Sequence, residues 1–174
     1  MDHVERFAEE AEAFDVWVSG GTDVGEEAAR NALLRVTRLY LAGLGLPPPW
    51  AEGGAEQSKA EGIGEAEWWA VYAAAEKRLP FNHYAEVFDP FIDPPEEPVT
   101  GSLADDIGDI FRDVVGGLRE YRAGRRATAI WEWGFLFRHH WGDHATGAIR
   151  ALHSWLAANA PDRLSPHYPA TVAR

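Results

Sequence analysis

The spacing of apolar residues along the chain predicts that it is built almost entirely from helices. Residues 2–17 are charged and only weakly amphipathic, as in a surface helix. In the segment that follows, apolar side chains recur at intervals of three and four, which places them on one buried helical face: Ala29, Leu33, Val36, Tyr40 and Leu44. We expect Thr22 or Asp23 to cap this second helix. Three consecutive prolines end it between Gly43 and Pro49.

The middle of the chain alternates between irregular and helical patterns. From about residue 45 to 65 it is rich in glycine and proline, lacks apolar periodicity, and is predicted to be a connection. A third helix is predicted over about 66–79, with Trp68, Tyr72, Ala75 and Leu79 on one side. Residues 81–88 are predicted to form a short helical piece. The proline-rich segment after them, up to Gly101, is predicted to be irregular.

From Ser102 onward the pattern predicts three helices joined by minimal breaks. Their ranges are about 103–123, 126–141 and 143–158, with breaks at Gly124 and Gly142. Such short connections favour antiparallel neighbours in a bundle. We therefore predict an all-α fold: one compact bundle of about five to six helices over residues 1–174, with the three C-terminal helices in a core at 81–158. Residues 159–174 are predicted to be an irregular tail.

Composition narrows the location and the partner of the protein. The chain has no cysteine, which excludes disulfides and thiolate metal sites. Its start lacks the basic and apolar regions of a signal peptide, and no apolar run reaches membrane-spanning length. The net charge of −12 disfavours nucleic acid and anionic membranes as partners. We therefore expect a cytoplasmic protein whose partner, if it has one, is another protein; the oligomeric state stays open.

Four aspartates crowd the start of the predicted helix 103–123. Ser102 followed by Asp105 matches the helix-start signal in which a side chain satisfies free backbone amides. Asp105 and Asp106 lie in the first turn, where the helix dipole favours anions. The dipole fades within a turn, so it does not account for Asp109 or Asp113. Those two residues carry the question of a functional site.

The acidic residues of this helix form a stripe apart from its apolar face. Three interpretations of the stripe stay open: a solvated or ion-paired face, which we favour, a buried hydrogen-bond network with the following helices, and a divalent-cation site. Arg112 is placed to offset part of the repulsion around Asp109. Gly108, Gly116 and Gly117 would be explained by a close helix neighbour, which Gly116 would bring to the acidic side.

The segment from Trp131 to His144 combines tryptophans with histidines. Gly142 is expected to break the helix between His140 and His144, so we favour hydrogen bonds from these two imidazoles to carboxylates or carbonyls over chelation of zinc. The candidate polar junction comprises Asp106, Asp109, Asp113, Trp131, Glu132, His140, Trp141 and His144. If a metal is present, the candidate ligands are Asp106, Asp109, Asp113, Glu132 and His144, with His140 or His144 as ligand or proton carrier.

Several motifs together resemble a known bacterial family. They are YAEVFDPF, SLADDIGDI at 102–110, WEW at 131–133 and HWGDH at 140–144. Over about residues 68–158 the chain is similar to the family of domain of unknown function 5063. The resemblance implies a compact helical fold and no established activity. Phe111 stands where tyrosine is expected in the family, which argues against a chemical role for that position.

Two functional hypotheses follow. The favoured one is a non-enzymatic cytoplasmic module for protein interaction, or an accessory module, without catalytic residues or cofactor. The core-like density of aromatic residues, the lack of a recognisable nucleophile and the acidic surface support it. The alternative is a protein that binds Mg²⁺, Mn²⁺ or Zn²⁺ through the acidic stripe from Asp105 to Asp113, with hydrolysis of a phosphorylated small molecule as its activity.

Overall fold

The computed structural model describes residues 2–52, 62–87 and 89–165. Within these ranges it has six α-helices, one β-hairpin and a short 3-10 turn. The helices are α1 (His3–Gly20), α2 (Gly25–Gly43), α3 (Glu65–Arg78), α4 (Leu103–Arg122), α5 (Arg126–His139) and α6 (Trp141–Asn159). The strands are β1 (His83–Glu86) and β2 (Val99–Ser102), and the 3-10 turn is Pro161–Leu164. The all-α helical bundle predicted from the apolar spacing is confirmed.

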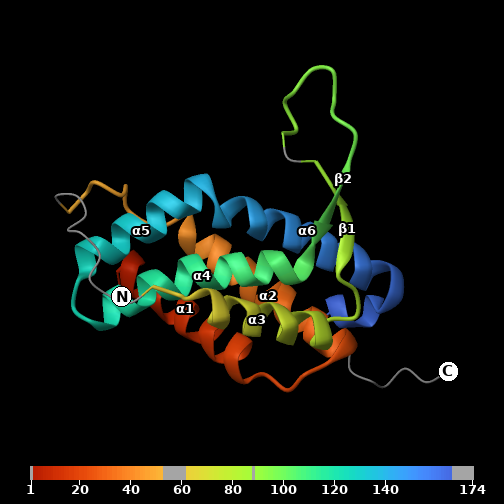
Figure 1. Cartoon of the computed structure of the whole chain (residues 1–174), viewed down its shortest axis with the longest axis horizontal. Coiled ribbons are helices and arrows are strands. Elements are labelled where there is room, and N and C mark those ends of the chain that lie inside the picture. Colours follow the sequence, from red (N-terminus) through yellow and green to blue (C-terminus); the bar gives the residue numbers. More distant parts are fainter. Residues whose placement is uncertain (1, 53–61, 88, 166–174) are drawn as a thin grey trace.

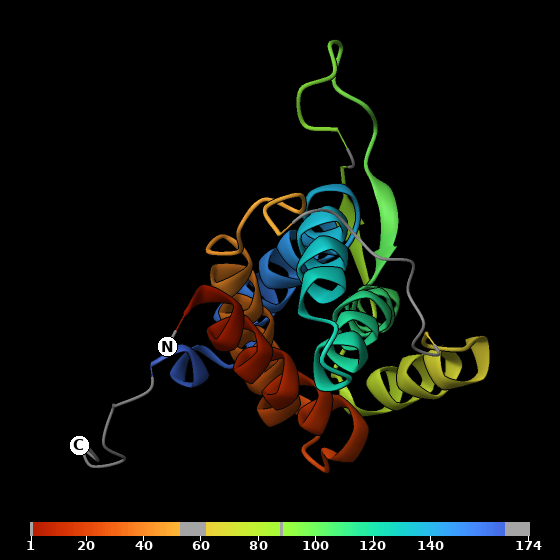
Figure 2. The same cartoon turned by 90° about the vertical axis from the view of Figure 1, so that its left-hand side faces the viewer.

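Helix α4 is the centre of the bundle. It packs against α1, α3, α5 and α6, and Figures 1 and 2 show α3 on one side of it and α5 and α6 on another. The apolar stripe of α4 is buried: Leu103, Ile107, Ile110, Val114 and Leu118. Because α4 is surrounded, its second stripe, the acidic one, also lies against other elements. None of the helices in the described ranges is long and apolar enough to cross a membrane.

A side chain caps the first turn in helices α1 and α4 but not in α2. In α1, Asp2 and Glu5 form a reciprocal capping box, and in α4 the Ser102 hydroxyl accepts from the Asp105 amide at 3.3 Å. The predicted cap of α2 by Thr22 or Asp23 is wrong, because Val24 is the cap residue and no side chain caps this helix. The Asp23 carboxylate instead accepts from the Trp17 indole at 3.0 Å.

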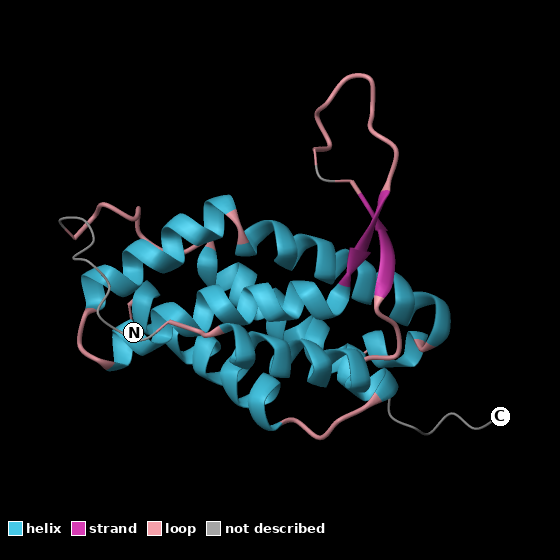
Figure 3. Cartoon of the chain, in the orientation of Figure 1, coloured by secondary structure: helices cyan, strands magenta, loops and turns pink. Residues whose placement is uncertain are grey.

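The segment 81–88 holds a strand, so the predicted short helix is wrong. Strand β1 pairs with β2 in antiparallel register, with Tyr84 opposite Gly101. Both strands are anchored at the start of α4, because the Asn82 carbonyl and side chain accept from the backbone amides of Leu103 and Ala104. The prediction of an irregular segment up to Gly101 missed β2, since four residues are too few to show alternation. Figure 3 shows the hairpin standing out from the helices.

The break between α5 and α6 lies at His140 and not at Gly142. His140 has non-helical backbone angles (φ −153°, ψ −85°), and Gly142 is inside the first turn of α6. A Cβ at Gly142 would collide with the Phe137 carbonyl oxygen, so this glycine permits close contact between the two helices. The predicted irregular tail contains the 3-10 turn; its last nine residues, 166–174, and most of the predicted connection, 53–61, lie outside the described ranges.

Candidate metal centre

The acidic stripe of α4 is buried and ion-paired. Of the favoured interpretation, a solvated or ion-paired face, the solvated form is therefore wrong. Asp106, Asp109 and Asp113 are 2%, 9% and 7% exposed. Helix α3 and the first turn of α6 cover them, and the hairpin covers Asp106. Asp105 is the half-exposed member, and the helix-start signal accounts for it. Three buried carboxylates on one helix require partners, because an unpaired buried charge is costly.

Two of these partners are the histidines that frame the start of α6. His140 Nδ1 lies 2.6 Å from Asp113 Oδ2, and His144 Nδ1 lies 2.9 Å from Asp106 Oδ1. A carboxylate that only accepts hydrogen bonds selects the tautomer with hydrogen on Nδ1 and leaves Nε2 as the lone-pair nitrogen. The predicted hydrogen bonds between these imidazoles and carboxylates are therefore present.

Both Nε2 atoms face the third aspartate. Oδ2 of Asp109 is 3.7 Å from His140 Nε2 and 3.3 Å from His144 Nε2. Ligand atoms of these three residues all lie within 4.8 Å of one another. In tetrahedral coordination with metal–ligand bonds of about 2.0–2.2 Å, ligand atoms are roughly 3.4 Å apart. The two distances from Asp109 Oδ2 to the Nε2 atoms are therefore close to the spacing of corners in a tetrahedral site.

The other oxygen of Asp109 is held from two sides. Oδ1 accepts from the Trp68 indole of α3 at 2.8 Å and pairs with the Arg112 guanidinium at 2.9 Å. These contacts fix the carboxylate so that Oδ2 is directed to the histidines. Trp68 lies over Gly108, where a Cβ would be 2.8 Å from its indole nitrogen. Gly108 thus allows the close neighbour that the sequence suggested, whereas Gly116 has nothing within 4 Å and does not.

Charge in the cluster is unbalanced towards the negative. With neutral histidines, three carboxylates and the Arg112 guanidinium leave a net charge of −2. Burial raises the pKa of Asp106 and Asp113, against the hydrogen bonds from His144 and His140. Burial lowers the pKa of His144, but the bond to Asp106 and the surrounding carboxylates outweigh it, so the net shift is upward. The site therefore favours the uptake of protons or of a cation.

The cluster is open to solvent on the histidine side. The side chains of His140 and His144 are 34% and 24% exposed, against 12% for Asp109. Structural zinc sites have four protein ligands, whereas catalytic sites have three and keep a position for water or substrate. Three convergent ligand atoms beside an accessible face match the second arrangement.

Three residues of the predicted junction, Trp131, Glu132 and Trp141, are not among the converging ligand residues. Trp141 is fully buried and donates to the Trp133 carbonyl at 3.2 Å. Trp131 stacks on Phe135. Glu132 is on α5 and is not part of the group of side chains, among the described residues, whose ligand atoms converge.

Two contributors to the site, Trp68 and Tyr84, are not predicted by the sequence. Tyr84 of β1 donates to Asp106 Oδ2 at 2.8 Å. Trp68 was assigned to the apolar side of its helix, and Tyr84 to a short helix. Nothing in the spacing of either residue pointed to α4, because their contacts span 41 and 22 residues of sequence.

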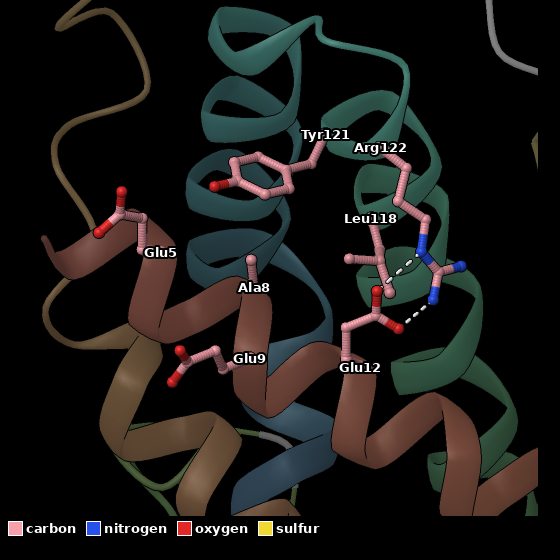
Figure 4. Close-up of a pocket in the computed structure, with 7 residues that line it drawn as sticks. All are labelled: Glu5, Ala8, Glu9, Glu12, Leu118, Tyr121 and Arg122. Atoms are coloured by element: carbon pink, nitrogen blue, oxygen red, sulfur yellow. Dashed lines mark hydrogen bonds and ion pairs between the residues drawn. The ribbon is translucent and has the colours of Figure 1, made fainter. Parts of the chain in front are cut away.

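A separate surface hollow of about 400 Å³ lies between α1 and α4. Figure 4 shows its lining, in which Glu12 is paired with Arg122 and Tyr121 lies near Glu5 and Ala8. It contains no histidine and none of the aspartates of the cluster. It is therefore not an opening to the candidate metal centre.

The chain is similar to a protein family and to a solved structure. The family model described as "Domain of unknown function (DUF5063)" matches residues 1–158. Among curated proteins, none matches the sequence. A similar solved structure is the crystal structure of protein BF1032 from Bacteroides fragilis, with a TM-score of 0.73 and 18% identity over 87% of this chain and 90% of that one. This likeness concerns the fold alone.

Proposed function

The chain belongs to the family of domain of unknown function DUF5063, and we propose that it is a divalent-metal-binding protein whose ion is held by Asp109, His140 and His144. The observation that carries the proposal is the orientation of the two imidazoles. Each Nδ1 is held by a buried carboxylate, and each Nε2 is directed to the same oxygen of Asp109. Carboxylate–histidine pairs that orient the free nitrogen are typical of metal-ligating histidines.

The roles of the predicted ligands change accordingly. Asp106 and Asp113 are assigned to the outer shell, since their oxygens face the Nδ1 atoms. His140 joins His144 and Asp109 as a ligand, and Glu132 is left out of the set. A divalent ion would also balance the net charge of −2 in the cluster.

The donor set discriminates among the predicted metals. Imidazole nitrogen suits Zn²⁺ and other transition metals, whereas Mg²⁺ prefers oxygen ligands and retains several waters. Two imidazoles and one carboxylate are therefore expected to prefer Zn²⁺ over Mn²⁺, and Mn²⁺ over Mg²⁺. Zinc with three protein ligands keeps one position for water and brings the pKa of that water to about 7.

If the centre holds zinc, its open side would leave a position for a water activated by the ion, which favours hydrolysis as the activity. Arg112, whose side chain is 43% exposed, stands beside Asp109 and offers a cation to an anionic group of a substrate. A phosphorylated small molecule thus stays the first substrate class to test. Release of phosphate from a panel of phosphoesters, with zinc-loaded and chelator-treated protein in parallel, measures this directly.

Calorimetric titration with Zn²⁺ tests the metal proposal. We expect one ion per chain in the unaltered protein and loss of binding in Asp109→Asn and in the double variant His140→Ala/His144→Ala. His153→Ala is the matched control, because His153 is an exposed histidine of the same helix. If the unaltered protein, freed of metal at neutral pH, takes up no zinc, the proposal is wrong.

A protein-interaction role stays a second candidate, supported by the loop of the hairpin. Phe91 is 92% exposed at this protruding loop. From residue 80 to 111 the chain has eight acidic residues and no lysine or arginine. A single protein partner that loses affinity for Phe91→Ser, but not for Val16→Ser on the exposed side of α1, would support it. The basic run Arg119–Arg126 does not favour nucleic acid, since its arginines are paired with carboxylates.

A further inference from the structure

Tyr84 places one hydroxyl group between two carboxyl groups. Its oxygen is 2.8 Å from Asp106 Oδ2 and 3.3 Å from Glu86 Oε1. Tyr84 and Glu86 are two residues apart on β1 and therefore point to the same side of the hairpin. On that side they lie against β2 and α6.

Two glycines make this arrangement possible. A Cβ at Gly147 of α6 would be 2.6 Å from the Tyr84 hydroxyl and 2.8 Å from Glu86 Oε1. A Cβ at Gly101 of β2 would be 2.7 Å from Glu86 Oε2 and 2.8 Å from the Tyr84 ring. Any other residue at either position would displace the pair, so the hydroxyl and the carboxyl are seated by the backbone around them.

Tyr84, Asp106 and Glu86 need one more hydrogen than the tyrosine hydroxyl supplies, if both contacts are to be hydrogen bonds. The Tyr84 hydroxyl has a single hydrogen, and the shorter contact assigns it to Asp106. Burial and the nearby carboxylates raise the pKa of Tyr84, so the hydroxyl keeps that hydrogen. Glu86 then faces an oxygen lone pair, and it makes a hydrogen bond there only if it carries a proton of its own.

The charges around Glu86 come from two helices, α4 and α6. Asp106 reaches it from α4, while His144 and Arg150 reach it from α6, where the exposed Asp143 lines the same pocket. On β2, which carries no charged residue, Gly101 lies against the carboxyl group. Burial and the Asp106 charge raise the pKa of Glu86, and the two α6 cations only partly oppose this.

We propose that Tyr84 and Glu86 are positioning residues of the metal centre, and that Glu86 holds a proton which leaves when the divalent ion binds. This rests on the proposed metal-binding function. Tyr84 fixes Asp106, Asp106 fixes the Nδ1–H tautomer of His144, and His144 Nε2 receives the ion. The hairpin thus belongs to the centre although it provides no ligand.

The loss of the Glu86 proton is a consequence of the positive charge that the ion would bring. Two positive charges added at His144 and Asp109 favour the ionised form of a carboxyl group connected to them through Tyr84 and Asp106. The neutral acid of Glu86 becomes a carboxylate, and its proton passes to water. The exit is a pocket of about 450 Å³ between the hairpin and α6, lined by Glu86 and Gly147 among others. Zinc affinity is therefore expected to rise with pH beyond the contribution of the two histidines.

The test counts the protons released on zinc binding by calorimetry in buffers of different ionisation enthalpy. Glu86→Gln keeps the shape and the neutral donor of a protonated Glu86 but has no proton to release. We expect it to bind one zinc ion and to release up to about one proton fewer than the unaltered protein between about pH 5 and 7. Tyr84→Phe removes the hydrogen bond to Asp106 and is expected to weaken zinc binding about tenfold.

Glu97→Gln is the control, because Glu97 is an exposed acid of the same hairpin loop; it should match the unaltered protein in both measurements. Equal proton release by Glu86→Gln and the unaltered protein, or unchanged affinity of Tyr84→Phe, overturns this proposal while leaving the metal centre in place. Absence of zinc binding by the unaltered protein overturns both. Thermal unfolding in chelator shows whether each variant is folded.

Discussion

The imidazoles of His140 and His144 lie with their ring centroids 4.9 Å apart and their planes at 71°. They come from a helix junction and from the first turn of α6, yet both meet the middle aspartate of three on α4. Asp106 and Asp113 lie three residues before and four residues after Asp109, so one face of α4 presents all three. The outer two hold the Nδ1 atoms and the middle one faces both Nε2 atoms.

The metal-free protein is expected to become less stable as the pH rises above about 6.5. The pKa of His144 is raised in the folded state, so its contribution to folding is complete below its unfolded value and is lost as the pH rises through the folded one. Asp106 and Asp113 act in the same direction from about pH 4 upward. Burial raises their pKa values above the ordinary 3.8, so ionising either carboxyl group costs more in the folded than in the unfolded chain.

Thermal unfolding between about pH 5 and 8.5 in chelator measures this effect. Saturating zinc should reverse the trend, because zinc requires the deprotonated imidazoles and replaces the protons. His144→Gln should flatten the metal-free curve, whereas His153→Ala should leave it unchanged. A metal-free midpoint that is constant or rises from pH 6.5 to 8.5 would contradict the described charge balance.

Two adjacent glycines of α4 are expected to respond to alanine with opposite signs. A Cβ at Gly117 would be 2.6 Å from Cδ1 of the Trp133 indole, which donates to the Val114 carbonyl at 2.9 Å. Gly117→Ala should therefore lower the free energy of unfolding by about 1–3 kcal/mol. Gly116 has nothing within 4 Å, so Gly116→Ala should raise it by about 1 kcal/mol through helix propensity. Urea unfolding of both variants measures the two changes, and equal signs would contradict the described packing of Trp133 against Gly117.

These glycines show what helical periodicity can and cannot predict. The spacing of apolar residues placed all six helices to within a few residues, since burial of one face dictates that spacing. It did not predict which element covers the other face of α4. A close helix neighbour was expected at Gly108, Gly116 and Gly117, and at Gly116 on the acidic side. Gly108 and Gly117 have such neighbours in Trp68 and Trp133, whereas Gly116 has none within 4 Å, because the placement of these tryptophans depends on long-range packing.

Arg78 is expected to resist replacement even by lysine. Its guanidinium pairs with Asp23, donates to the Trp17 carbonyl at 3.1 Å, and lies 4.8 Å from the centre of the Trp17 indole. Lysine keeps the charge but offers neither the planar stacking nor the several directed donors. Arg78→Lys should lower the free energy of unfolding by about 2 kcal/mol in urea. Arg38→Lys, at an exposed position of α2, is the control, and its free energy of unfolding should stay within about 0.5 kcal/mol of that of the unaltered protein. A similarly small effect of Arg78→Lys would contradict the described contacts of Arg78 with Asp23 and Trp17.

The candidate centre was predictable in its residues more than in its geometry. Asp109 and Asp113 were singled out because the helix dipole does not reach them, and they are buried against the histidines. The expected break at Gly142 concealed the possibility that both imidazoles face one oxygen. As a weak helix former, glycine is expected to break a helix. The first turn of α6 nevertheless needs Gly142 for its close approach to Phe137. A short-range rule therefore failed where a tertiary contact decided the conformation.

Asparagine at position 113 is expected to separate metal affinity from stability. Asp113 accepts from His140 Nδ1 at 2.6 Å and so leaves Nε2 without hydrogen. An asparagine amide can donate to Nδ1 instead, which moves the hydrogen to Nε2, where it would point to Asp109 and block a metal ion. Zinc affinity of Asp113→Asn should fall about 10–100-fold with the stoichiometry retained.

The same change removes a buried carboxyl group whose pKa burial has raised, against the bond to His140. The metal-free variant should therefore unfold at the same temperature as the unaltered protein at about pH 8, or at a higher one. General damage to the fold would lower affinity and stability together, so the two measurements distinguish it from a tautomer effect. Asp143→Asn, an exposed acid in the first turn of α6, is the control and should change zinc affinity less than about threefold. Zinc binding by Asp113→Asn as tight as in the unaltered protein would show that Asp113 does not orient a ligand.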